Sequence, residues 1–184
     1  MFYTHLARRA FTGRSNMTTF KITHEINCNE AAFWELFFDK EFNKKLYLEG
    51  LEFNEWVLED QSETDTEIKR KTRGKPKLKN VPGPVAKILG DSFGYSEVGH
   101  MDKTKKVWTW KLTPTVMAEK IKQEGSLKIE AIGDDKVRRS VEMLIEAKVF
   151  GIGGMLESTA EKQLKDGWEN SAVFMNKWIA ANKK

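Results

Sequence analysis

The last thirty residues of the chain carry its longest helical pattern. Residues 154–184 contain no proline, follow the glycine-rich segment 150–154, and repeat apolar side chains with the period of an α-helix. On a helical wheel, one side collects Ala160, Leu164, Gly167, Trp168, Ser171, Phe174, Met175, Trp178 and Ile179. The other side collects Lys162, Lys165, Asp166, Glu169, Asn170, Asn176 and Lys177. The pattern predicts one long amphipathic helix whose buried stripe, with large and small side chains mixed, leaves gaps against a sheet.

Upstream of this helix, apolar and polar residues alternate with the period of a β-strand. Residues 18–27 place four side chains on one parity: Phe20, Ile22, His24 and Ile26. Six further strands are expected at 51–59, 64–73, 93–101, 106–113, 126–132 and 137–149, with turns at 60–62, 102–104 and 133–135. Residues 115–124 fit either a strand or a loop. The short connections between successive strands predict an antiparallel sheet.

Two short helices are expected between the first strand and the second. Asn27 and Glu30 have the spacing of a capping box, which predicts a helix that begins at Asn27. Its apolar residues are Ala31, Phe33, Trp34, Phe37 and Phe38. Asp39 then predicts the start of a second helix, which runs through Phe42, Leu46 and Tyr47 and ends at Gly50.

A basic segment lies between the third and fourth expected strands. Residues 69–79 hold seven basic residues and no acidic one, and an apolar, turn-rich segment follows at 81–90. Two interpretations stay open. The first is a membrane-touching flap whose cations (Lys75, Lys77 and Lys79) meet anionic lipid while an apolar tip (Val81, Val85, Ile88 and Leu89) enters the headgroup zone. The second is a loop packed over the core.

The net charge of +4 adds little to this picture, because it resides at the N-terminus. Residues 1–24 hold four basic residues and no acidic one, whereas the other 160 residues hold 27 of each. The balanced remainder gives no reason to expect a nucleic-acid partner. One cysteine, Cys28, excludes an intramolecular disulfide, and no apolar run is long enough for a membrane span.

Residues 1–17 are read apart from the single domain expected at 18–184. Three interpretations stay open for them: an extension from an upstream start, a flexible native arm, and a mitochondrial targeting peptide. The last is the least favoured, so a cytoplasmic location is expected.

Few residues suggest chemistry. His24 lies on the apolar parity of its strand, which favours a core or pocket-lining histidine over a general base. Glu157 lies near the start of the long helix, where it would stabilise the helix dipole or act as a polar anchor in a pocket. Cys28 is interpreted as structural, and His100 has no partner evident in the sequence. The three histidines lack metal-ligand spacing, so neither a metal nor another cofactor is expected.

The order of these elements resembles that of the START-like (SRPBCC) superfamily. The resemblance is carried by Thr19–Ile26 followed by residues 29–39, and by residues 149–157 at the entry to the last helix. It extends to an uncharacterised bacterial branch and to sterol-transferring relatives. It implies an α+β helix-grip fold, in which a curved antiparallel sheet of about seven strands wraps around the C-terminal helix. It also implies an apolar pocket, with residues 74–92 in the position of a lid and membrane contact.

The resemblance and the pattern together predict a protein that binds or transfers a hydrophobic small molecule, such as a lipid or sterol, without catalysis. A cavity of roughly 300 Å³ or more is expected. Its expected lining is Phe20, Ile22, His24, Trp108, Trp110, Met143, Leu164, Trp168, Ser171 and Met175. Two alternatives remain. One is a cyclase or dehydratase that uses His24 or Glu157, and the other is a protein-interaction module of the chaperone co-activator kind.

Overall fold

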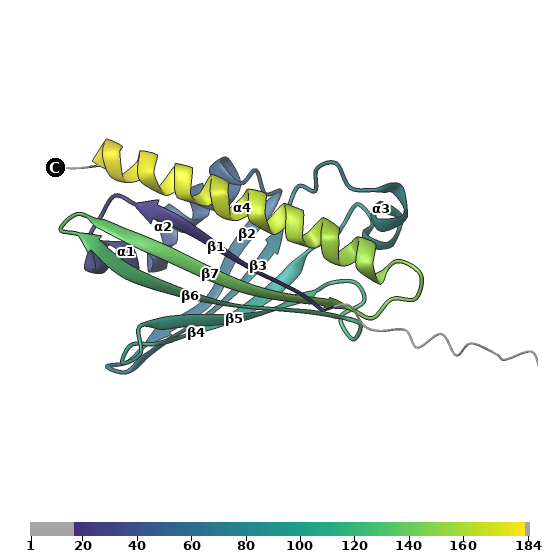
Figure 1. Cartoon of the computed structure of the whole chain (residues 1–184), viewed down its shortest axis with the longest axis horizontal. Coiled ribbons are helices and arrows are strands. Elements are labelled where there is room, and N and C mark those ends of the chain that lie inside the picture. The colour runs from purple at the N-terminus through teal and green to yellow at the C-terminus, as the bar shows by residue number, and fades with distance from the viewer. Residues whose placement is uncertain (1–16, 183–184) are drawn as a thin grey trace, which may run out of the picture.

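Seven antiparallel strands form one curved sheet in the computed structural model, which describes residues 17–182 (Figure 1). The strands are β1 (Thr18–Ile26), β2 (Glu55–Glu63), β3 (Glu67–Lys75), β4 (Tyr95–Asp102), β5 (Val107–Pro114), β6 (Ile121–Gly133) and β7 (Lys136–Ala147). Their order in the sheet is β1-β7-β6-β5-β4-β3-β2. The interpretations of residues 1–16 concern a segment that lies outside the described residues.

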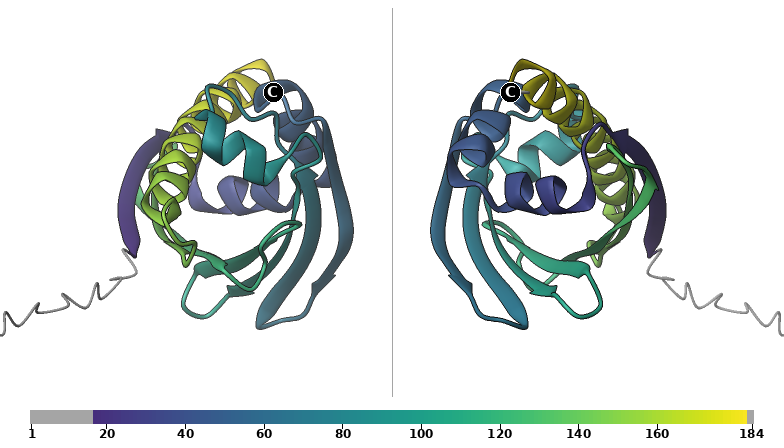
Figure 2. Two further views of the ribbon diagram at one scale, coloured as in Figure 1. Left: turned by 90° about the vertical axis from the view of Figure 1, so that its right-hand side faces the viewer. Right: turned by 90° about the vertical axis from the view of Figure 1, so that its left-hand side faces the viewer.

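The helices cover the concave face of this sheet and its two ends. They are α1 (Glu30–Phe38), α2 (Lys40–Lys45), the π-helix η1 (Leu46–Gly50), α3 (Gly83–Leu89) and α4 (Gly153–Asn182). The long helix α4 lies along the sheet, with α1 and α2 near one end and α3 near the other (Figure 1). Seen along the sheet, the strands curl into an open cylinder whose two ends carry these short helices (Figure 2). The helix-grip fold expected from the sequence is confirmed.

Two glycines allow large indole rings to lie flat on the concave face. Gly99 of β4 and Gly125 of β6 flank the β5 residues Trp108 and Trp110. A Cβ atom added at Gly99 would overlap the ring of Trp108, and one added at Gly125 would overlap the ring of Trp110. Because glycine has no side chain, these two positions on the neighbouring strands leave room for the tryptophan rings, which form part of the inner wall.

The start of α1 differs from the expectation. Asn29, and not Asn27, is the N-cap, since its Oδ1 accepts a hydrogen bond from the backbone N–H of Ala32 at 2.9 Å. The expected capping box is therefore wrong by two residues. Asp39 starts α2 as expected, because its Oδ1 accepts from the N–H of Phe42.

Two further boundaries differ from the expectation. Residues 60–62 continue β2 instead of forming a turn, because they pair with residues 69–71 of β3 beyond an irregularity at 58–60. The turn lies at 64–66. Residues 121–124, which fitted strand or loop, belong to β6, and the apolar segment expected as a flap or loop contains α3.

Candidate functional site

A cavity of about 490 Å³ lies between α4 and the concave face of the sheet. Its walls come from β3 to β7 and from α4, with η1 and the segment around α3 at its margins. The expectation of a cavity larger than roughly 300 Å³ is confirmed.

Seven of the ten side chains expected to line the cavity do so. They are Trp108, Trp110, Met143, Leu164, Trp168, Ser171 and Met175. The ring of Trp110 on the sheet lies 5.7 Å from the ring of Trp168 on α4. Contact between the two indoles therefore connects the sheet wall of the cavity to its helix wall. Ser171 donates its hydroxyl proton to the backbone oxygen of Trp168 at 2.7 Å.

Phe20, Ile22 and His24 lie outside the cavity lining, contrary to expectation. All three are on β1, at the edge of the sheet beside β7, and α4 packs directly on this strand. Lys165 of α4 lies with its Nζ 5.2 Å from the centre of the Phe20 ring. The inward side chains of β1 are therefore covered by the helix, whereas several of β4 to β7, such as Trp110 and Met143, line the cavity.

His24 supports the cavity wall through Arg139 of β7. Its Nδ1 lies 3.1 Å from Arg139 Nη2, and a guanidinium can only donate, so Nδ1 accepts and the ring proton is on Nε2. That Nε2 lies 3.2 Å from a carboxylate oxygen of Glu169 on α4. Burial and the charge of Arg139 lower the pKa of His24, while Glu169 opposes them. A neutral histidine is thus held in the core, away from the cavity.

Arg139 connects this support to the cavity, which it lines. Its Nη2 donates to the backbone oxygen of Trp168 at 2.8 Å, and its guanidinium lies 5.0 Å from the centre of the Trp168 ring. Burial lowers the pKa of Arg139 to about 9. The contact fixes the middle of α4 against β7.

Glu157 is buried outside the cavity and acts as a hydrogen-bond acceptor. Its Oε1 accepts from the backbone N–H of Ala147 at 2.8 Å, and its Oε2 from the hydroxyl of Thr18 at 3.0 Å. The carboxylate therefore ties the first turns of α4 to the end of β7 and the start of β1. The second of the two interpretations of Glu157, a polar anchor in the pocket, is wrong, because Glu157 is not part of the lining.

The seven cations of the basic segment 69–79 are paired in space with five carboxylates, most of them distant in the sequence. Lys75 Nζ lies 2.7 Å from an oxygen of Glu55, and Lys77 and Lys79 lie 3.3 Å and 2.8 Å from the carboxylate of Glu52. The other cations face Glu55, Glu59, Glu67 and Glu97. The segment, which runs along β3 and into the stretch before α3, is ion-paired and is not a bare cationic band.

The apolar part of the expected flap is packed inward. Val85 is fully buried, Leu89 is buried, and Val81 and Ile88 are half-buried. Val85 and Leu89 pack against Ala147 and Leu156 and line the cavity. The structure thus has the second of the two sequence interpretations, a segment packed over the core, because α3 turns its apolar side towards the cavity.

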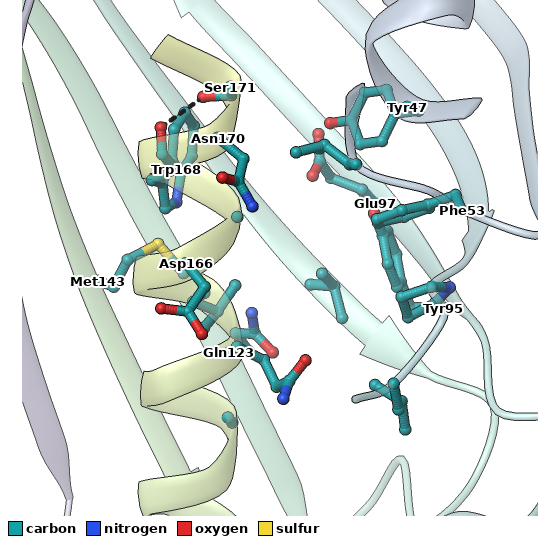
Figure 3. A pocket seen from close by; sticks show the side chains of 18 of the residues that line it. Tyr47, Phe53, Tyr95, Glu97, Gln123, Met143, Asp166, Trp168, Asn170 and Ser171 are labelled. Carbon is teal, nitrogen blue, oxygen red and sulfur yellow. Dashed lines mark hydrogen bonds between the residues drawn. The ribbon is translucent and has the colours of Figure 1, made fainter. Parts of the chain in front are cut away.

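The sequence reasoning missed a polar group of side chains in the cavity wall. Tyr47 of η1, Tyr95 and Glu97 of β4, and Arg70 of β3 line the cavity. Figure 3 shows Tyr47, Tyr95 and Glu97 across the cavity from α4. A signal existed in the strand pattern: Tyr95 and Glu97 share the parity of the buried Met101. A carboxyl group on an apolar parity marks a candidate site residue.

Polar residues of α4 also reach the cavity. Asp166 and Asn170 were placed on the solvent side of the helical wheel, yet both line the cavity, with Gln123 of β6 near them (Figure 3). The helical wheel assigns one buried face to α4. In the structure this face lies over the cavity, so residues at its edge line the cavity as well.

Metal-binding and membrane-spanning features are not found in residues 17–182. No group of three or more histidine, cysteine or carboxylate residues in that range is arranged to hold a metal ion. Within the same range, none of the helices has the length and hydropathy of a membrane span. Cys28 is buried in the core, and His100 lies on the outer face with its Nε2 2.9 Å from a carboxylate oxygen of Glu67.

Comparisons with known proteins identify the fold. A family model described as a protein of unknown function (DUF2505) matches residues 21–179. A comparison with curated proteins finds no match. Among solved structures, protein TTHA0849 of Thermus thermophilus has a TM-score of 0.66 at 14% identity, with 91% of this chain and 100% of that chain covered.

Two further structures carry descriptive names. An aromatase/cyclase, ZhuI, of Streptomyces sp. R1128 has a TM-score of 0.63 at 11% identity, with 91% and 99% of the two chains covered. A START superfamily protein of Mycobacterium smegmatis has a TM-score of 0.55 at 14% identity, with 90% and 99% covered. At these identities the likeness shows the fold alone, and it confirms the START-like fold that the sequence resemblance implied.

Proposed function

Because the chain belongs to the DUF2505 family and has a START-like fold, we propose that it binds a hydrophobic small molecule as a carrier or sensor. The observation that carries the proposal is the cavity of about 490 Å³ under α4. Its volume lies in the range of small-molecule pockets. Transfer of an apolar ligand from water to walls rich in aromatic and aliphatic side chains is favourable. A lipid or a sterol belongs to this ligand class.

The ends of the cylinder support a carrier. One end carries α1 and α2, and the other carries α3, whose apolar residues pack into the cavity margin (Figure 2). Gln163 of α4 donates its side-chain amide to the backbone oxygen of Lys79 at 2.7 Å, which joins α4 to the segment before α3. As a short helix at the margin of the cavity, α3 is the element that would move to admit a ligand.

A second candidate function is an enzyme of the cyclase or dehydratase kind. One observation favours it: Tyr47, Tyr95 and Glu97 are proton-bearing groups that face the cavity. His24 and Glu157, the acid–base candidates from the sequence, lie outside the lining. The acid–base role would therefore fall on Glu97. The third alternative is a protein-interaction module. It requires a filled core and is therefore not supported, because the core contains the cavity.

We also propose that the protein meets an anionic membrane when it exchanges its ligand. The exposed apolar group for this contact is Phe150, which lies fully exposed in the turn between β7 and α4. Met155, in the first turn of α4, is also exposed, while the nearby Lys148 is paired with Glu146 at 3.3 Å. An exposed aromatic ring beside an exposed methionine has the chemistry of a shallow membrane anchor.

The carrier is tested by native mass spectrometry of the protein purified from its own host. A retained small molecule is extracted, identified and incubated again with fresh protein. A carrier returns the molecule unchanged, whereas an enzyme of the second kind converts a bound precursor. In parallel, the apolar fluorophore N-phenyl-1-naphthylamine is titrated into the protein, with fluorescence enhancement expected on binding.

A matched pair of glycine variants of α4 controls this titration. Gly167 lines the cavity, and a Cβ added there meets no atom within 4 Å, so Gly167→Phe would place a ring in the hollow. Gly154 is exposed at the start of the same helix, so Gly154→Phe adds the same ring outside. Loss of fluorophore binding in the first variant alone supports the cavity. Unchanged binding in both would contradict the proposal.

A further inference from the structure

Tyr47, Tyr95 and Glu97 form one polar end of an otherwise mainly apolar cavity. Tyr95 and Glu97 are two residues apart on β4 and therefore share its concave face, and Tyr47 approaches from η1. Figure 3 shows the three side chains on the wall opposite Trp168 and Met143. We call these residues the Tyr47–Tyr95–Glu97 cluster.

The cluster lacks hydrogen-bond partners among the residues that the structure describes. Tyr95 is 8% exposed and the side chain of Glu97 is 12% exposed. Within residues 17–182, neither tyrosine hydroxyl makes a hydrogen bond, and the carboxyl group of Glu97 makes none. Polar side chains that line a cavity and have no partner among these residues are free to contact the polar part of a bound molecule.

Arg70 lies close to Glu97 but makes its contacts with other residues. Its Nη2 lies 3.9 Å from Glu97, beyond hydrogen-bond distance, while its Nη1 donates to the backbone oxygen of Phe37 at 2.9 Å. Its guanidinium is also stacked on the rings of Phe37 and Trp108, 4.8 Å and 4.9 Å from their centres. Arg70 therefore leaves the cluster open towards the cavity.

The surroundings favour the protonated form of each member. Burial raises the pKa of Glu97, and the charge of Arg70 opposes this shift. Burial, followed by the charge of Glu97, raises the pKa of Tyr47, and burial likewise raises that of Tyr95. Each phenol carries one O–H donor, and Glu97 adds a third donor when it is protonated, so the cluster presents donors to the cavity.

On the premise that the cavity binds a hydrophobic small molecule, we propose that the Tyr47–Tyr95–Glu97 cluster binds a carbonyl oxygen of that molecule. A carbonyl oxygen has two lone pairs and no proton, which complements these donors. A hydrocarbon would leave the donors unpaired, and a carboxylate would bring a second acidic group beside Glu97 in a poorly solvated site. The ligand class is an uncharged, mainly apolar ketone, aldehyde or ester whose carbon skeleton lies against the tryptophans.

Two probes of nearly equal shape test the assignment. Displacement of N-phenyl-1-naphthylamine is measured with 2-acetylnaphthalene, a ketone, and with 2-isopropylnaphthalene, its hydrocarbon analogue. We expect the ketone to bind about 10-fold more tightly, because one net hydrogen bond of this kind lowers the dissociation constant by about that factor. Tyr47→Phe and Tyr95→Phe should each weaken ketone binding about 5- to 10-fold and change hydrocarbon binding less than about 2-fold.

Gln123→Met is the matched control, because Gln123 lines the cavity on β6 without belonging to the cluster. It should leave the ratio of ketone to hydrocarbon affinity unchanged. An infrared difference spectrum adds a direct readout. The carbonyl stretch of bound 2-acetylnaphthalene should shift to lower wavenumber, and the Tyr47→Phe/Tyr95→Phe double variant should reverse the shift.

The outcomes separate this inference from the proposed function. Equal binding of ketone and hydrocarbon by the parent protein, with no effect of the tyrosine variants, overturns the carbonyl site and leaves the apolar cavity intact. Tighter binding of 2-naphthoate than of the ketone overturns the choice of an uncharged acceptor. Failure of both probes and of N-phenyl-1-naphthylamine overturns the proposed function, and the carbonyl site with it.

Discussion

At the scale of single residues, His24 and Glu97 are two buried titratable groups whose environments shift their pKa values in opposite directions. His24 is held in the core by Arg139, and Glu97 faces the cavity at a distance of 3.9 Å from Arg70. In each case burial is the largest cause and disfavours the charged form. Each group therefore makes folding stability depend on pH, with a different sign.

Glu97 should lower stability as the pH rises. Its raised pKa means that the folded state keeps a proton that the unfolded chain loses above about pH 4.5. Stability is then complete below that pH and is lost as the pH rises through the folded pKa. Urea midpoints of the parent and of Glu97→Gln, measured from pH 4 to pH 9, should diverge in favour of the variant as the pH rises. Parallel curves would mean that Glu97 titrates normally.

His24 should lower stability as the pH falls. The pKa of His24 is lowered in the folded state. The unfolded chain therefore binds a proton below about pH 6.5, whereas the folded protein binds it only at a lower pH. The contribution of His24 to the stability of the folded state is fully present above pH 6.5 and is lost on acidification. His24→Gln keeps an acceptor for Arg139 but does not titrate. The parent should therefore lose stability relative to this variant between pH 7 and pH 5, and a constant difference across that range would contradict the assignment.

At the scale of elements, the two kinds of glycine have opposite expected effects. Gly125 of β6 lies under the ring of Trp110, so Gly125→Ala should overpack the wall and cost about 1–3 kcal/mol. Gly167 lies inside α4 with open space around its missing side chain, so Gly167→Ala should add about 0.5–1 kcal/mol through helix propensity. Denaturant midpoints measure both. A stabilising Gly125→Ala would show that Trp110 moves aside easily.

The sequence predicted elements better than it predicted their ends. Period-two alternation identified all seven strands, and helical periodicity identified α4, because burial of one face controls both patterns. It failed at residues 60–62, whose polar side chains indicate a turn in isolation. Pairing with the basic face of β3 extends β2 through them. The capping error has a similar cause, since Asn27 and Asn29 are both good caps and only geometry selects one.

At the scale of the whole molecule, the sequence predicted the existence of the cavity but not its polar end. Strand parity places Trp108, Trp110 and Met143 on the inner wall, and the structure agrees. It cannot show that α4 covers β1, which removes Phe20 and Ile22 from the lining, because that depends on the angle of the helix across the sheet. The ion pairs between segment 69–79 and Glu52 or Glu55 likewise join residues far apart in the chain.

The distribution of charge and exposed apolar surface over the molecule changes the prediction for membranes. Lys75 faces Glu55, and Lys77 and Lys79 share Glu52, so the net attraction of these lysines to an anionic surface is reduced. Phe150 is fully exposed and has no apolar partner to leave when it enters a headgroup layer. Membrane contact should therefore depend on the turn between β7 and α4 and not on the basic segment.

Co-sedimentation with vesicles of phosphatidylcholine and phosphatidylserine tests this prediction. Phe150→Ser should abolish binding and leave the melting temperature within about 2 °C of the parent, because an exposed side chain contributes little to stability. Val98→Ser is the matched control, since Val98 is another exposed apolar residue on β4. Replacement of Lys75, Lys77 and Lys79 by Gln should have little effect. If that triple variant loses binding while Phe150→Ser retains it, the membrane contact lies on the basic segment, and ligand exchange would proceed past α3, which follows that segment.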